Sequence, residues 1–366
     1  MRSPAVVVND VERLLQTKER KVRRSKRSTA NRFDMRRYHS LSEIDDYMAS
    51  VVERYPEFAR VVTIGYSNEN RPIKVVEIGL AKVASKPIIW VDGLIHAREW
   101  PSAQVALGFV DRLLQVHRSD STEDKILLSE LNWVIAPVLN PDGYVYSFEH
   151  GGDTKRRFWR RNRSDASCRI SNGRRQARCC VGVDLNRNFD FYFAEFGRTR
   201  ASLNDPCVED YHGPTAFSEP ETQAIRDYFV LRINEIKAVI NFHTYAQVWL
   251  LPYGHKRYAY PENGREQRRL AHDAVDELER NYNTYYSVNT GPNIWYGASG
   301  QFTDWATKLG VPFAYTVELS PRMLTRGMGG FVTDTESLPL MIKETFAAAK
   351  VIAHYVRRKY GKRYGD

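Results

Sequence analysis

The sequence has no apolar run that approaches the roughly 18 residues of a membrane-spanning helix. It also lacks an internal repeat and a visible secretory signal peptide, because residues 1–8 (MRSPAVVV) contain no long apolar segment. A hydrophobic content of 42% beside 27% charged residues is typical of a globular chain. We therefore expect a soluble protein without a membrane span and, if it is secreted, an incomplete precursor.

Cysteine is scarce, and all four copies fall within one 40-residue stretch, at Cys168, Cys179, Cys180 and Cys207. None belongs to the spaced C-x-x-C pairs of a structural zinc site. An even, clustered set favours disulfides and an oxidising compartment. Buried free thiols in a cytosolic protein are the alternative.

The net charge of +10 is concentrated in two segments. Residues 1–37 carry a net +8 and residues 154–178 a net +9, so the remainder of the chain is mildly acidic. A basic arm and a basic loop favour proteolytic processing or contact with a polyanion over a surface that reads nucleic acid. We expect no specific nucleic-acid partner.

The chain divides near residue 38. Residues 9–37 combine a short amphipathic stretch with a polar, basic linker, whereas a compact domain is expected over residues 38–366. Within the linker, residues 24–27 read R-S-K-R, a site for a furin-like or trypsin-like protease if it is exposed. The alternative is a basic tail that is not cut.

Strand and helix patterns alternate through the compact domain. Ser40 and Glu43 form a capping box for a helix ending near Tyr55, and a second box is expected at Ser218 and Glu221. The predicted strands are RVVTIGYS, IKVVEIGL, PIIWVDGL, NWVIAPVLN, IKAVINF and PFAYTVEL, separated by helical patterns such as WPSAQVALGFVDRLLQVH, REQRRLAHDAVDELERNY and LPLMIKETFAAAKVIAHYV. This order predicts an α/β fold, a three-layer sandwich with a mixed, largely parallel central sheet flanked by helices.

Three candidate metal ligands follow predicted strands. His96 and Glu99 form an H-x-x-E pair after PIIWVDGL, and His243 follows IKAVINF. Sites in such folds lie at the carboxyl ends of strands. Two imidazoles and one carboxylate suit zinc and leave a fourth position open, as in a catalytic site. An H-x-x-E pair alone is a weak signal, however.

The motifs around these residues appear in one order: HAREW, NPDGY, WRRNRS, GVDLNRN, HTYAQVWLLPYG, YGASG and TVEL. Together they resemble the digestive-type zinc metallocarboxypeptidases, the carboxypeptidase A and B type. The resemblance covers residue 38 to the C-terminus, and VVVNDVERLL is more weakly similar to the end of the family's prosegment. It implies a secreted zymogen that removes C-terminal residues from peptides with a free C-terminus, and we expect a monomer.

The resemblance implies a role for each matching residue. One Zn²⁺ per chain would be held by His96, Glu99 and His243, with Glu318 as the general base that activates the attacking water. Arg163 would polarise the scissile carbonyl. The other implied positions are Arg98 and Arg160 as auxiliary substrate-binding arginines, Asn186, Arg187 and Tyr296 as the clamp on the terminal carboxylate, Tyr245 as a cleft wall, and Asp184 behind a zinc-bound histidine.

The resemblance also implies the disulfides and the specificity pocket. Cys180 and Cys207 match the family's cysteine pair, which leaves Cys168 and Cys179 to pair by elimination. The pocket floor falls at Thr303, with Gly254, Gly291, Phe302 and Thr316 as neutral lining residues. A terminal Lys or Arg would then be desolvated without a counter-ion, so apolar or aromatic terminal residues are expected. A B-type or broad specificity, or an inactive binding protein on the same fold, are the alternatives; a cytosolic relative fits the cysteines less well.

Overall fold

The computed structural model describes residues 33–79, 86–149, 152–165, 167–169, 178–199, 205–321 and 327–361. The predicted processing site at residues 24–27 lies outside the described residues, and the boundary at residue 38 stays a prediction. The short segment that precedes this boundary packs onto the domain. The ring of Phe33 stacks on His39 and Tyr47, with centroids 3.7 and 4.2 Å apart.

The core of the domain is an eight-stranded sheet in the order β1-β2-β4-β3-β7-β10-β8-β9. The four central strands β4, β3, β7 and β10 run parallel, whereas β1, β2 and β8 pair antiparallel with their inner neighbours. The strands are β1 (Ala59–Tyr66), β2 (Pro72–Ile78), β3 (Ile88–Asp92), β4 (Asn132–Ala136), β7 (Ile236–Thr244), β8 (Val248–Leu250), β9 (Ser287–Asn289) and β10 (Phe313–Leu319).

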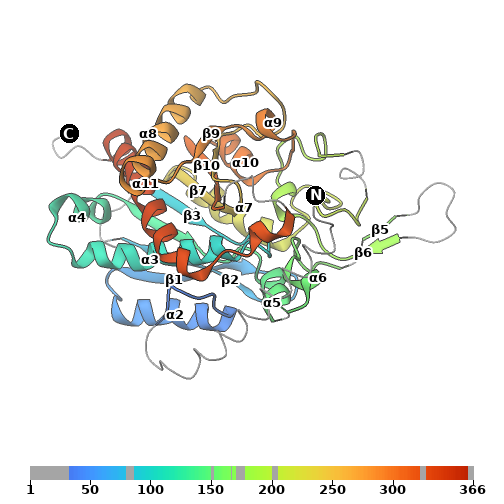
Figure 1. The fold of residues 1–366 in the computed structure, drawn as a ribbon, viewed down its shortest axis with the longest axis horizontal. Helices are drawn as coiled ribbons and strands as arrows, with labels where there is room; N and C mark the ends of the chain where they lie inside the picture. Colours follow the sequence, from blue (N-terminus) through green and yellow to red (C-terminus); the bar gives the residue numbers. More distant parts are fainter. Residues whose placement is uncertain are drawn as a thin grey trace.

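Helices cover both faces of this sheet, which gives the three expected layers (Figure 1). One face carries α2 (Leu41–Arg54), α3 (Trp100–Arg118), α4 (Thr122–Ser129), α8 (Gly264–Tyr282) and α11 (Leu338–Tyr360). The other carries α7 (Pro220–Arg232) and α10 (Phe302–Leu309). Shorter helical segments are α5 (Pro141–Glu149), α6 (Thr154–Arg157), α9 (Gly291–Ile294), η1 (Leu185–Arg187), η2 (Gly327–Phe331) and η3 (Thr335–Ser337). The predicted sandwich is confirmed.

Alternation along the strands explains why two cores form. Successive side chains of a strand point to opposite faces, so Val91 and Ile89 of β3 join the core under α3, whereas Trp90 and Ile88 join the core under α7. Strands buried on both faces read as continuous apolar runs, as PIIWVDGL does. In the part of the chain that is described, no helix is long and apolar enough to span a membrane.

The first predicted capping box is confirmed, and the second is wrong. Ser40 caps α2 by accepting from the Glu43 amide, and the Glu43 carboxylate accepts from the Ser40 amide in return. Helix α7 instead begins at Pro220, with Glu219 in the N-cap position. The Ser218 hydroxyl is engaged elsewhere, since it donates to the Glu219 carboxylate and accepts from Asn188.

Both expected disulfides are present. Cys168 bonds Cys179 across the two-stranded hairpin formed by β5 (Ser167–Arg169) and β6 (Arg178–Cys180), which projects from the body of the domain (Figure 1). Cys180 bonds Cys207. The described residues contain no free cysteine. Two disulfides favour an oxidising compartment over a reducing one.

Candidate metal centre

The candidate ligands meet at the carboxyl end of the central parallel strands. His96 and Glu99 lie in the connection from β3 to α3, and Glu99 is the N-cap residue of α3. His243 lies near the end of β7, directly opposite Glu318 of β10 in the parallel register. Neighbouring parallel strands end at the same edge of a sheet. The connection from β3 to α3 and the ends of β7 and β10 therefore bring the four side chains together.

His96, Glu99 and His243 form one buried cluster whose ligand atoms all lie within 4.8 Å of one another. The two Nδ1 atoms are 3.1 Å apart. Each also lies 2.9 Å from a different oxygen of the Glu99 carboxylate. Among the described residues this is the one group of three such side chains placed to hold a metal ion.

The far side of each imidazole is held by an oxygen atom. Nε2 of His96 lies 3.0 Å from Oδ1 of Asp184, and Nε2 of His243 lies 2.7 Å from Oδ1 of Asn241. In the tautomer with the ring proton on Nε2, each histidine donates to its oxygen partner and keeps a lone pair on Nδ1. The two lone pairs and the Glu99 carboxylate then converge on one point. A bound cation fits this arrangement, and the N₂O donor set suits zinc.

Asn241 is a functional residue that the sequence reasoning missed. It stands inside the largely apolar strand run IKAVINF, and its side chain is fully buried. A buried polar side chain needs a hydrogen-bond partner. Its amide nitrogen donates to the buried Asp92 carboxylate at 2.5 Å, and the Trp90 indole donates to the same carboxylate at 2.7 Å. Burial raises the pKa of Asp92 to about 7, although these two hydrogen bonds lower it. The asparagine within this buried strand was the feature of the sequence from which its role could have been inferred.

Glu318 faces the cluster without ligating it. Burial raises the pKa of this carboxyl to about 7; His243 and Arg160 lower it, whereas the like charge of Glu99 raises it. A general base works best when its pKa lies near the operating pH. The environment of Glu318 therefore suits proton transfer next to the three ligands.

The structure gives different surroundings to Arg160 and Arg163, two of the three arginines of the WRRNRS motif. Arg160 turns toward the cluster: Nη2 lies 2.8 Å from Asp184 and Nη1 lies 3.8 Å from Glu99. Arg163 instead lies over two aromatic rings, with its guanidinium 4.0 Å from the centroid of the Tyr146 ring and 4.7 Å from that of Trp159. Its nearest described carboxylate is Glu69, at 4.0 Å. The arginine that the sequence comparison gave an auxiliary role is thus the one beside the candidate ligands.

A second group of side chains borders the centre. Arg98 donates to Glu209 at 3.1 Å and lies over the Phe331 ring, 4.5 Å from its centroid. The Tyr245 ring packs edge-on against the same Phe331, with centroids 5.1 Å apart. Arg157, which the sequence analysis did not single out, donates to the carbonyls of Arg98 and Phe331 at 2.8 and 2.7 Å. Arg157 therefore links α6 to the backbone at Arg98 and at Phe331.

Two members of the predicted carboxylate clamp are adjacent and fixed. The Asn186 side-chain oxygen accepts from the amide of Phe302 at 2.9 Å, and Arg187 Nη1 donates to the carbonyl of Asn186 at 2.7 Å. The backbone of Gly300 touches Arg187 so closely that a Cβ there would lie 2.0 Å from the Arg187 oxygen. Tyr296, the third member, lies on the surface with 38% of its area exposed.

Two of the five predicted pocket residues, Thr303 and Thr316, contact each other. The hydroxyls of Thr303 and Thr316 are 3.0 Å apart. The amide of Gly254 donates to the buried Asp304 carboxylate at 2.7 Å, and burial raises the pKa of Asp304 to about 7. A residue not predicted, Gln301, lays its side-chain amide against Gly254, where a Cβ would meet it at 2.1 Å. No side-chain atom lies near the Cβ position of Gly291.

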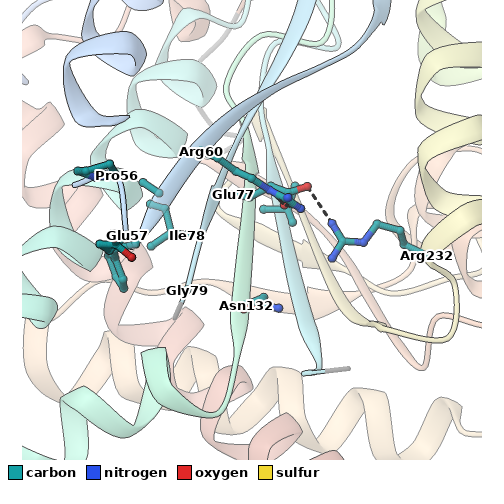
Figure 2. Close-up of a pocket in the computed structure, with 11 residues that line it drawn as sticks. Pro56, Glu57, Arg60, Glu77, Ile78, Gly79, Asn132 and Arg232 are labelled. Carbon is teal, nitrogen blue, oxygen red and sulfur yellow. Dashed lines mark hydrogen bonds and ion pairs between the residues drawn. The ribbon is translucent and has the colours of Figure 1, made fainter. Parts of the chain in front are cut away.

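A different pocket, of about 170 Å³, lies where β4 begins, at the amino end of the sheet (Figure 2). Three of its four charged side chains are paired with one another. Glu77 accepts from Arg60 at 2.6 Å, from Arg232 at 2.8 Å and from Tyr228 at 2.7 Å. The fourth is Glu57, and no group of metal-ligating side chains is found here among the described residues, so this pocket offers no chemistry comparable to the centre above.

Comparison with known proteins agrees with this centre. Residues 44–348 match the family described as zinc carboxypeptidase. The chain is 35% identical to carboxypeptidase B of Astacus astacus over 89% of this chain and 99% of that protein, and 35% identical to carboxypeptidase A2 of Mus musculus over 96% and 78%. The crystal structure of thrombin-activatable fibrinolysis inhibitor superposes with a TM-score of 0.80 at 31% identity, covering 96% of this chain and 81% of that one. Carboxypeptidase A of Helicoverpa armigera gives a TM-score of 0.80 at 27% identity, with coverage of 97% and 81%.

Proposed function

Since the chain belongs to the zinc carboxypeptidase family and is a metallocarboxypeptidase, we propose that it holds one zinc ion and removes neutral residues from the free C-termini of peptides. The observation that carries this proposal is the buried convergence of His96, Glu99 and His243, with an oxygen acceptor within hydrogen-bond distance of Nε2 of each imidazole. When bound, zinc supplies a Lewis acid that polarises a carbonyl and lowers the pKa of a water molecule.

The residues around the ligands supply the general base, the fixed positive charge and the binding site for the terminal carboxylate. Glu318 takes the proton of the attacking water and returns it to the leaving amine, a task that its raised pKa supports. Arg160, held by Asp184, places a fixed positive charge beside the oxygen that becomes negative in the transition state. Arg187, Asn186 and Tyr296 bind the terminal carboxylate, which an internal peptide bond does not present.

We expect the oxyanion role to follow Arg160 and not Arg163. Arg160→Ala should lower kcat by ~10²–10³-fold, the usual effect of removing one oxyanion donor. Arg163→Ala should lower it much less, because that guanidinium stacks on Tyr146 and Trp159. Steady-state kinetics on one peptide decides between them. A larger loss in the Arg163 variant, with zinc content and folding intact, would restore the role that the motif comparison assigned.

The clamp predicts strict dependence on a free C-terminus. Peptides with an amidated C-terminus should be cleaved far more slowly than their acids, because amidation removes the charge that Arg187 and its neighbours would bind. The matched pair isolates this charge, since it leaves the scissile bond and both side chains unchanged. Equal kcat/KM values for acid and amide would contradict the proposed exopeptidase action.

The pocket supports a preference for uncharged terminal side chains. The grouped hydroxyls of Thr303 and Thr316 offer no full charge, and Asp304 is already bound to the Gly254 amide. A terminal Lys would lose its hydration without a counter-ion. In a competition among peptides ending in Phe, Leu, Thr, Lys and Glu, we expect the neutral residues to have the higher kcat/KM. Gln301→Gly should widen the pocket and favour Phe over Thr; a strong preference for Lys would overturn this assignment.

The setting of the enzyme is part of the same proposal. Two disulfides support a secreted, extracellular zymogen, activated by a trypsin-like or furin-like protease at residues 24–27. Its substrates are peptides and proteins with free C-termini, and it acts as a monomer. Bovine thrombin-activatable fibrinolysis inhibitor is known in complex with a tick carboxypeptidase inhibitor, and the 32% identity to it supports inhibition of this enzyme by proteins of that kind.

A further inference from the structure

We propose that a surface pocket lined in part by Tyr296, next to the proposed carboxylate clamp and apart from the candidate metal ligands, binds a sulfated polysaccharide chain. The pocket has a volume of about 620 Å³ and lies between three loops. These loops are residues 195–199, residues 255–257 and the segment that follows α9, residues 295–297. None of the candidate metal ligands lines it.

The lining carries an excess of unpaired positive charge. Arg198, Lys256 and Arg257 are exposed, and none of them forms an ion pair with a carboxylate in the described parts of the chain. Glu195 is the single acidic residue on the lining. Arg257 is oriented by its Nε, which donates to the carbonyl of Pro292 at 2.9 Å. Three cations without counter-ions in one hollow attract a ligand with several negative charges.

Hydrogen bonds and close packing join the three loops, so the backbone that carries the three cations is held in place before a ligand arrives. The amide of Phe196 donates to the Ser299 hydroxyl at 3.1 Å, and the Ser299 amide donates to the Phe196 carbonyl at 3.0 Å. The amide of Ala298 donates to the Gly254 carbonyl at 2.8 Å. Gly297 packs so tightly on the carbonyl of His255 that a Cβ would lie 2.1 Å from it. Preorganised sites lose less entropy on binding.

The mixture of charge and aromatic surface favours a sulfated sugar over other polyanions. A planar guanidinium group can donate two parallel hydrogen bonds to two oxygens of a tetrahedral sulfate group. Trp295, with 37% of its surface exposed, offers a ring on which a sugar ring can pack. In the extracellular setting proposed above, which the two disulfides support, sulfated polysaccharides are abundant polyanions.

The test measures binding of a size-defined, fully sulfated heparin tetrasaccharide to the full chain by titration calorimetry. The variant Arg198→Gln/Lys256→Gln/Arg257→Gln should bind roughly tenfold or more weakly, since it loses three charge-assisted contacts. A control of equal charge change, Lys125→Gln/Lys308→Gln/Arg358→Gln, removes exposed cations of α4, α10 and α11. It should bind like the unmodified protein. Both variants should cleave a peptide at the normal rate, which shows that they are folded.

The outcomes separate this pocket from general attraction. Equal weakening in both variants would mean that net charge alone draws the sugar, and unchanged binding in the pocket variant would place the sugar elsewhere; either result overturns the proposal. Binding of the desulfated tetrasaccharide with equal affinity, or equally effective competition by a glutamate-rich peptide or by inorganic sulfate, would also overturn the choice of ligand. Weakening in the pocket variant alone, with dependence on sulfation and on chain length, supports it.

Discussion

Removal of the metal is expected to abolish peptide cleavage, and added Zn²⁺ is expected to restore it. Asp184 and Asn241 offer acceptors to Nε2 of His96 and His243, and with the ring protons there both Nδ1 lone pairs and the Glu99 carboxylate face one point. Without a cation there, the cluster loses its Lewis acid while Glu318 and Arg160 remain. The measurement is turnover of one peptide before chelation, after chelation, and after stepwise addition of zinc, with bound metal counted by elemental analysis.

The ligand and its support can be distinguished in the same experiment. His243→Ala should lose the ion entirely. Asn241→Ala should retain the ligands but weaken zinc affinity about 10–100-fold, the usual cost of removing a group that orients a metal-bound histidine. A preparation that is free of metal and yet cleaves the peptide at full rate would refute the zinc centre. One ion per chain at full activity would support the proposed stoichiometry.

The three layers could be predicted from the sequence because strands that are buried on both faces appear as continuous apolar runs. A run such as PIIWVDGL admits few structures, and its position before the H-x-x-E pair places both ligands at a strand end. The exact start of α7 was not predictable in the same way. Ser218 and Glu221 have the spacing of a capping box, but Pro220 sets the first turn and Asn188 engages the serine from 30 residues away in the chain.

The arginines show where a motif stops being informative. Five arginines lie between residues 156 and 163, and their chemistry is identical in the sequence. Their different roles come from neighbours that only the fold supplies. Asp184 holds Arg160 at the metal centre, and the aromatic rings of Tyr146 and Trp159 hold Arg163 away from it. For the same reason Gln301 was overlooked, since its contact with Gly254 depends on how α10 meets a loop 47 residues earlier.

Replacing Glu318 by glutamine is expected to lower kcat by ~10²–10⁴-fold while zinc content and affinity for a substrate-like inhibitor stay near normal. The amide keeps the size of the side chain but cannot accept the proton of the attacking water. The pH dependence of kcat/KM gives an independent test. Burial raises the pKa of Glu318 to about 7, so kcat/KM should rise with pH as this carboxyl loses its proton. A bound cation lowers the pKa of a neighbouring carboxyl, so this rise, the acidic limb of the profile, should lie at or below pH 7.

The glutamine variant should lose this acidic limb together with the rate. Glu262→Gln, at an exposed position ahead of α8, is the matched control and should leave both kcat and the profile unchanged. If the Glu318 variant kept near-normal turnover, another group would have to be the base, and the buried Asp92 lies behind His243 where it cannot reach the substrate. If the variant instead lost its zinc, the effect on rate would measure the metal and not proton transfer, and for that reason metal content is measured on the same samples as kcat.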